Sequence, residues 1–263
     1  MRFTKMQGLG NDYLYVYGEV PDGVAELSTR LSDRHFGAGS DGMVFICPSQ
    51  IADFGMRIFN ADGSEAMMCG NGIRCVGKYV FDKGLTHKSS LAIETLSGVR
   101  HLELDVRDGV VESVTVDMGH AEVGDDIALD VRGERVACTP VSVGNPHAVM
   151  FVDDADKAPV GTLGPLVEHH DTFPGGVNVE FAQVLHDRSI RMRVWERGSG
   201  ITMACGTGAC ATVAAAVRRG LCPAGVPISV SLDGGMLDVT VSDDGFIVMR
   251  GPATTVYEGE VAL

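Results

Sequence analysis

Residues 56–72 read MRIFNADGSEAMMCGNG, and residues 192–208 read MRVWERGSGITMACGTG. A shift of 136 positions aligns the two stretches without a gap, and the identities include the cysteine and the glycines that follow it. A second match lies upstream, where GLGNDYLYV from residue 8 resembles SVGNPHAVMFV from residue 142 and pairs Gly10-Asn11 with Gly144-Asn145. A repeat period this long predicts two similar domains rather than a solenoid.

Both copies predict the same local structure. MRIFN and MRVWE alternate apolar and polar residues, as half-buried strands do. A helix is expected after each Cys-Gly-x-Gly, and each expected helix ends in basic residues and glycine, at Lys83-Gly84 and Arg219-Gly220. Short alternating segments elsewhere are typical of strands. The predicted fold is α+β, with two pseudo-symmetric domains that each wrap a curved β-sheet or barrel around a central helix.

The expected division assigns residues 1–117 to a first half that carries Cys69. Residues 118–263 form a second half that carries Cys205. A return of the last strand to the first half is left open.

Composition narrows the partners of the chain. The 263 residues carry a formal net charge of −14, which argues against a nucleic-acid partner. No apolar run approaches the roughly 18 residues that a membrane span requires, and the N-terminus resembles neither a signal peptide nor a transit peptide. Seven cysteines, an odd number, predict reduced thiols and a cytoplasmic location.

The placement of the two repeated cysteines predicts chemistry. A helix N-terminus carries partial positive charge and lowers the pKa of a nearby thiol. Its N–H groups also bind anions such as carboxylates, and glycine lets a ligand approach the backbone closely. Cys69-Gly70-Asn71-Gly72 and Cys205-Gly206-Thr207-Gly208 are therefore each expected to place a base beside an anion site.

Two such sites facing one carbon atom would invert a stereocentre. A thiolate would remove a proton from one face, and the opposite thiol would deliver a proton to the other. The expected chemistry requires no cofactor. No metal is expected either, since the spacings Cys69 to Cys75 and Cys205 to Cys210 are poor zinc patterns.

The sequence resembles the diaminopimelate epimerase family over nearly its whole length. The resemblance is carried, in order, by GLGNDY, IFNADGSEAMMCGNGIRC, VGNPHAV, GVNVEF and VWERGSGITMACGTGAC. It implies the fold of that family and the conversion of LL-2,6-diaminopimelate to the meso form without pyridoxal phosphate, a step of lysine and peptidoglycan precursor synthesis. It also implies a homodimer.

The same resemblance implies roles for individual residues. Cys69 and Cys205 match the two acid/base thiols, with Cys69 as proton donor and Cys205 as acceptor for the LL substrate. His147 and Glu196 match residues that adjust the thiol pKa values. The substrate-binding set is expected to be Asn11, Asn60, Gly70, Asn71, Asn145, Asn178, Glu196, Arg197, Gly206 and Thr207.

Two positions depart from the family pattern, and two other functions stay open. Ala148 stands where many members have cysteine, and Gly42 stands where some have a substrate-contacting glutamine. One alternative is another cofactor-independent amino-acid racemase, such as one acting on proline. The other is a non-catalytic thiol or metal-binding protein.

Overall fold

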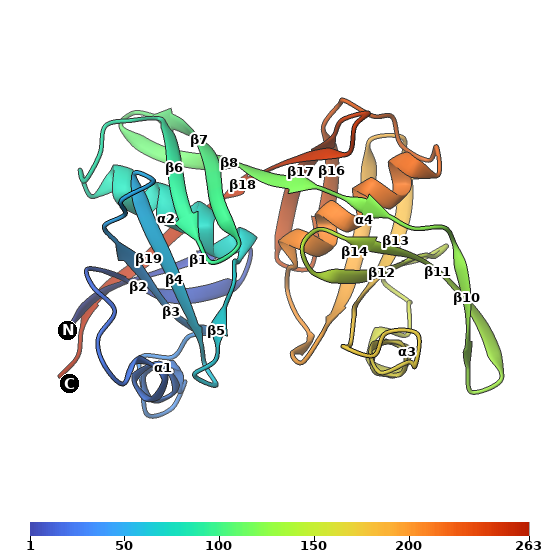
Figure 1. The fold of residues 1–263 in the computed structure, drawn as a ribbon, viewed down its shortest axis with the longest axis horizontal. Coiled ribbons are helices and arrows are strands. Elements are labelled where there is room, and N and C mark those ends of the chain that lie inside the picture. Colours follow the sequence, from blue (N-terminus) through green and yellow to red (C-terminus); the bar gives the residue numbers. More distant parts are fainter. Residues whose placement is uncertain (263) are drawn as a thin grey trace. The chain divides into compact units, whose positions relative to one another are not determined.

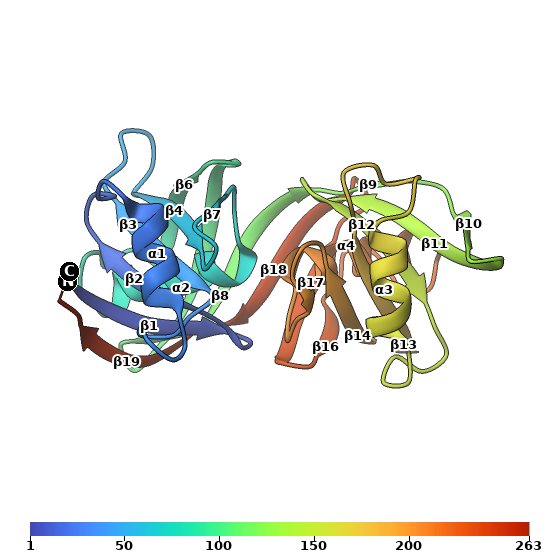
Figure 2. The same cartoon turned by 90° about the horizontal axis from the view of Figure 1, so that it is seen from below.

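The computed structural model describes residues 1–262, and these divide into two compact units (Figures 1 and 2). The first unit contains residues 1–117 and 251–262, and the second contains Met118–Arg250. The chain enters the second unit within β8 (Val110–His120) and returns within β18 (Phe246–Pro252).

The first unit consists mainly of strands, with two helices. Its elements are β1 (Arg2–Gly8), β2 (Asn11–Tyr17), α1 (Val24–Ser32), β3 (Gly42–Cys47), β4 (Phe54–Asn60), β5 (Glu65–Ala66), α2 (Gly70–Asp82), β6 (Ser90–Thr95), β7 (Gly98–Arg107), the first part of β8, and β19 (Thr254–Glu260). Hydrogen bonding orders its main strands as β19, β1, β2, β3, β4, β6, β7 and β8.

The second unit repeats this plan. Its elements are β9 (Glu122–Val123), β10 (Ile127–Val131), β11 (Glu134–Ser142), β12 (Pro146–Phe151), α3 (Val160–Glu168), β13 (Asn178–His186), β14 (Ser189–Glu196), β15 (Gly200–Ile201), α4 (Gly206–Arg218), β16 (Ile228–Leu232), β17 (Gly235–Val241) and most of β18. The main strand order is β9, β11, β12, β13, β14, β16, β17 and β18. Parallel pairs fall at equivalent places, β2 with β3 and β12 with β13, so the repeat seen in the sequence is a repeat of topology.

A central helix lies within the sheet of each unit, as Figure 1 shows. Helix α2 packs against β1, β2 and β7, and α4 packs against β9, β11, β12, β13 and β17. Because each helix contacts strands from both ends of its sheet order, the sheet curves around the helix. Residues Ala209–Ala216 of α4 are all buried, as an apolar surface on every side requires. The predicted α+β fold with a central helix in each half is confirmed.

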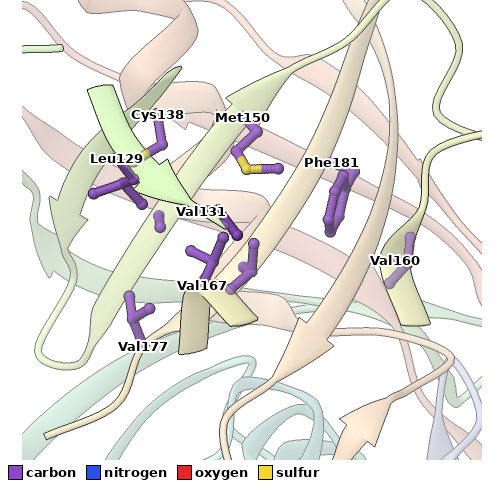
Figure 3. Packing of buried hydrophobic residues seen from close by; sticks show 10 residues of the cluster. Leu129, Val131, Cys138, Met150, Val160, Val167, Val177 and Phe181 are labelled. Carbon is purple, nitrogen blue, oxygen red and sulfur yellow. The ribbon is translucent and has the colours of Figure 1, made fainter. Parts of the chain in front are cut away.

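Each unit has one other helix, which packs on different strands. Helix α1 packs on β3 and β4, and α3 packs on β13, β14 and β15. Figure 3 shows the apolar cluster beside α3, in which Val160 and Val167 of the helix pack with Met150 and Phe181 of the sheet. Within residues 1–262, no helix combines the length and the apolar character needed to cross a membrane.

Candidate active site

Cys69 is the N-cap residue of α2. Its backbone is extended, with φ −138° and ψ 117°, and its Sγ accepts a hydrogen bond from the backbone N–H of Gly72 at 3.4 Å. The thiol therefore replaces the serine or aspartate that usually caps a helix. This brings a partly buried sulfur to the positive end of the helix dipole.

Cys205 caps α4 in the same way. Its φ is −120° and its ψ is 109°, and the N–H of Gly208 donates to its Sγ at 3.3 Å. The repeated Cys-Gly-x-Gly thus folds into the same cap twice. The second glycine of this motif, Gly208, leaves little room for a side chain. A Cβ atom there would lie 2.8 Å from a carboxylate oxygen of Glu180.

Polar groups from β2 and the loop before β3 surround Cys69. The thiol donates to Oδ1 of Asn11 at 3.3 Å, and the Asn11 amide nitrogen donates to Asp41 at 2.8 Å. Asp41 thereby fixes which side of the Asn11 amide faces the sulfur. Tyr13 lies buried beside them, and burial, followed by the proximity of Cys69, raises the pKa of Tyr13 well above its usual range.

A longer network surrounds Cys205. Thr207 Oγ1 lies 3.5 Å from its Sγ, and the amide nitrogen of Asn145 donates to Thr207 at 3.3 Å. Asn145 Oδ1 in turn lies 3.0 Å from Nε2 of His147, and Nδ1 of His147 lies 2.7 Å from Oε1 of Glu180. Three of the expected site residues, Asn145, His147 and Thr207, thus meet beside one of the expected thiols.

Glu196 completes the surroundings of Cys205. It ends β14 and accepts a hydrogen bond from the Thr202 hydroxyl. Burial raises the pKa of Glu196, and the negative charge of Glu180 raises it further, while hydrogen bonds from Thr202 and Cys205 and the nearby His147 oppose the shift. The carboxyl of Glu196 is therefore close enough to influence the thiol.

The expected lowering of the thiol pKa by the helix dipole is wrong for Cys205. Burial raises its pKa well above the usual range, and the negative charges of Glu196 and Glu180 raise it further. The hydrogen bonds from Thr207 and Gly208 act in the opposite direction but are outweighed.

Replacing Glu196 with glutamine should make Cys205 more reactive. The substitution removes a negative charge that raises the pKa of Cys205, and each unit of decrease raises the thiolate fraction about tenfold. We expect alkylation of Cys205 by iodoacetamide at pH 8 to accelerate by up to about tenfold, as measured by peptide mass spectrometry. Cys138, whose pKa is raised to about 11 by burial and then by Asp126, serves as the control in the same digest. An unchanged rate at Cys205 would contradict the electrostatic explanation.

Asn178 and Arg197 meet at a turn rather than at the sulfur. The Asn178 amide nitrogen donates to the Pro146 carbonyl at 3.0 Å, and its oxygen accepts from the backbone N–H of Arg197 at 3.0 Å. The exposed Arg197 guanidinium donates to the Gly175 carbonyl. Asn178 therefore positions both the start of β12 and the backbone that carries Arg197.

The remaining expected residues occupy less direct positions. Asn60 ends β4 and donates to the Ser64 hydroxyl at 3.1 Å, and the Asn71 oxygen accepts from Arg74 at 3.0 Å. Gly70 and Gly206 are the first residues of α2 and α4. Gly42 has φ +155°, and a Cβ atom there would lie 2.2 Å from the Phe59 carbonyl oxygen, so this backbone excludes the glutamine of other family members.

Two acidic residues of these surroundings were not anticipated from the sequence. Asp41 orients Asn11, and the fully buried Glu180 holds His147. A signal for Glu180 was available, because a glutamate in the apolar run VNVEFA needs a buried partner. Nothing in the local sequence distinguishes Asp41 from a turn residue.

Crystal structures of other proteins share the fold. The PhzF-family phenazine biosynthesis protein of Bacillus anthracis matches with a TM-score of 0.81 and 17% identity, covering 100% of this chain and 99% of that protein. A hydroxyproline epimerase from Agrobacterium vitis, solved with trans-4-hydroxy-L-proline, matches with a TM-score of 0.77 and 20% identity, covering 100% and 92%. These likenesses show that the fold of the chain is shared with those proteins.

Sequence relationships are closer and more specific. A diaminopimelate epimerase of Parabacteroides distasonis is 52% identical over 264 residues, which cover 98% of this chain and 97% of the relative. That of Acetivibrio thermocellus is 47% identical over 278 residues, covering 100% and 99%. The family model for diaminopimelate epimerase matches residues 3–124 and 139–256. The chain belongs to the diaminopimelate epimerase family, and the family resemblance expected from its motifs is confirmed.

Proposed function

We propose that this epimerase interconverts LL- and meso-2,6-diaminopimelate, with Cys69 and Cys205 acting on opposite faces of one carbon atom and without pyridoxal phosphate. The observation that carries the proposal is the duplicated cap, in which each cysteine begins a central helix with the same backbone and the same bond to a glycine N–H. The names of the full-length relatives support the choice of substrate.

The proposed step balances without an oxidant or a reductant. A thiolate takes the α-hydrogen as a proton, which breaks the C–H bond and leaves its electron pair on the carbon. The opposite thiol gives its proton to that carbon from the other face, so a thiolate and a thiol have exchanged places. The N–H groups of the two helix starts would stabilise the charge that develops on the substrate carboxylate.

Cys69 is proposed as the proton donor and Cys205 as the acceptor for the LL substrate, as the family resemblance implies. Each sulfur accepts a glycine N–H, and each thiol also donates a hydrogen bond, Cys69 to Asn11 and Cys205 to Glu196. Either thiol can therefore give a proton, as reversal of the reaction requires.

A charged substrate would counteract the effect of two glutamates on the pKa of Cys205. Glu196 and Glu180 raise the pKa of Cys205 by their negative charge. A substrate ammonium group near Glu196 would offset that charge and so favour the thiolate at the moment it is needed.

The other expected residues would hold the polar ends of the substrate. Four amides, those of Asn11, Asn60, Asn145 and Asn178, suit a molecule with two amino-acid ends because an amide both donates and accepts. Arg197 suits the distal carboxylate, to which a guanidinium can bind with two parallel hydrogen bonds.

Exchange of α-hydrogen in deuterated water tests the function directly. With diaminopimelate, we expect the enzyme to incorporate deuterium at the α-carbon and to establish the LL and meso forms at equilibrium, as measured by NMR and chiral chromatography. Proline is the matched comparison substrate. Exchange with proline and none with diaminopimelate would reject the proposal in favour of a proline racemase-like activity.

We also propose that the protein is a homodimer in the cytoplasm. The dimer is supported by the family resemblance, and the location by the odd number of cysteines, which is seven. Light scattering coupled to size-exclusion chromatography measures the mass in solution. A mass of 27.8 kDa, that of one chain, would reject the dimer.

A further inference from the structure

A buried acid–histidine pair lies beside Cys205. His147 on β12 and Glu180 on β13 both have fully buried side chains, and their nearest polar atoms are 2.7 Å apart. The second oxygen of Glu180, Oε2, is buried and has no hydrogen-bond partner within residues 1–262. Burial of a carboxyl group costs free energy of folding unless a partner offsets the loss of hydration. His147 is the partner that the structure gives to Glu180.

The first unit has no equivalent of this pair. Aligning Asn11 with Asn145 places Tyr13 opposite His147. The parallel registers then place Val44 opposite Glu180, because Leu14 pairs with Met43 and Ala148 pairs with Val179. The acid–histidine pair is therefore a local difference between two otherwise repeated sites.

The hydrogen bonds fix how many protons the pair holds. Asn145 Oδ1 can only accept, so Nε2 of His147 must be the donor in their 3.0 Å contact. A carboxylate oxygen and an unprotonated Nδ1 would repel each other at 2.7 Å. One proton must therefore lie between Nδ1 of His147 and Oε1 of Glu180, and the pair as a whole carries no net charge.

The same bonds set the direction of a chain that ends on the sulfur. Because Asn145 uses its oxygen to accept from His147, its nitrogen donates to Thr207. The Thr207 oxygen accepts that bond, and its own proton can be donated to Sγ of Cys205, 3.5 Å away. In the first unit the equivalent Asn11 instead accepts directly from Cys69.

We propose that Glu180 is a positioning residue for Cys205. It holds one shared proton with His147, and the pair sets the direction of the hydrogen bonds through Asn145 and Thr207 so that the sulfur receives one. The effect on epimerisation rests on the proposed function. The shared proton between His147 and Glu180 does not depend on that function.

The charged and titratable groups that face Cys205 come from three strands. They are His147 on β12, Glu180 on β13 and Glu196 on β14. The shared proton offsets the charge of Glu180 within the pair, although Glu180 remains a negative group close to Cys205.

Glu180→Gln separates the charge of this residue from its packing. Glutamine keeps the size of the side chain, and its amide nitrogen can donate to Nδ1, but it cannot share a proton with the ring. In protein labelled with ¹⁵N-histidine, we expect Nδ1 of His147 to change from the protonated signal of the wild type to that of an unprotonated acceptor. Nε2 should stay protonated in both, and His147→Gln assigns the signals.

Glu168→Gln is the matched control. Glu168 is another buried carboxyl of the same unit, but it accepts from neutral donors, Trp195 Nε1 and the Gly198 N–H. Its replacement should leave the His147 nitrogen signals unchanged. An unprotonated Nδ1 in the wild type, or the same Nδ1 signal in wild type and Glu180→Gln, would overturn the shared proton.

Kinetics then test the effect on Cys205. For Glu180→Gln we expect kcat for diaminopimelate to fall about tenfold and KM to stay within about twofold. The double variant Glu180→Gln with His147→Gln should be no slower than the slower single variant. A wild-type kcat in Glu180→Gln, or a raised KM with kcat unchanged, would overturn the positioning role. Wild-type enzyme inactive on diaminopimelate would instead reject the proposed function and leave the NMR result standing.

Discussion

Alanine in place of Cys69 or Cys205 is expected to reduce the rate of diaminopimelate epimerisation by at least about 10³-fold. Each thiol is proposed to serve one face of the reacting carbon, and a lost general acid or base typically removes 10²- to 10⁴-fold in rate. The rate would be followed by chiral chromatography of the two stereoisomers. Activity within about tenfold of wild type in either variant would contradict the two-thiol mechanism.

Stability measurements separate this loss from unfolding. Each substitution removes the sulfur that accepts a helix N–H, from Gly72 or from Gly208, so we expect a decrease of about 1 kcal/mol in the free energy of unfolding. Cys138→Ala is the control, because that thiol is buried in the apolar cluster beside α3 and away from the site. It should retain activity within about twofold.

Alanine at Gly208 is expected to reduce kcat about 100-fold and to destabilise the protein by about 1–3 kcal/mol. The new Cβ would lie 2.8 Å from Oε1 of Glu180 and 3.2 Å from Sγ of Cys205. Glu180 cannot retreat easily, since the same oxygen is bound to His147 at 2.7 Å. The added methyl group should therefore displace both the thiol and the acid–histidine pair, as seen in kinetics and in urea unfolding.

Gly72→Ala is the matched comparison, because Gly72 holds the same position after Cys69. There the nearest atom to a new Cβ is the terminal methyl carbon of Met56 at 3.1 Å, which belongs to a flexible side chain, and Sγ of Cys69 is 3.6 Å away. We expect smaller losses in both kcat and stability than at Gly208. Equal effects at the two glycines would show that the close approach of Glu180 is not the cause.

Most of the fold that could be predicted from the sequence was predicted from its internal duplication. MRIFN and MRVWE became β4 and β14, and each Cys-Gly-x-Gly became a helix start, because alternation and capping are local properties of the chain. The family motifs added positions such as Asn145 and His147, which the structure brings together beside Cys205. How the polar side chains pair could not be predicted, since the partners come from separate strands.

The pKa of Cys205 illustrates that limit. The helix dipole is readable from the sequence, but the burial of the thiol and the approach of Glu180 and Glu196 depend on tertiary packing. These effects raise the pKa of Cys205, which is opposite to the direction expected from the dipole. Glu180 itself could have been noticed as a charge within an apolar strand, although its partner, 33 residues away, could not have been named from spacing.

The pairing of β1 with β19 has a consequence for biosynthesis. Arg2 lies opposite Glu260, so β1 pairs with a strand that is translated only after the whole second unit. The second unit is a continuous segment and can close its sheet while translation continues, whereas the first must wait with one edge of β1 unpaired. An exposed strand edge invites pairing with other chains. Nascent chains that terminate before β19 should therefore depend on chaperones or be removed by proteolysis.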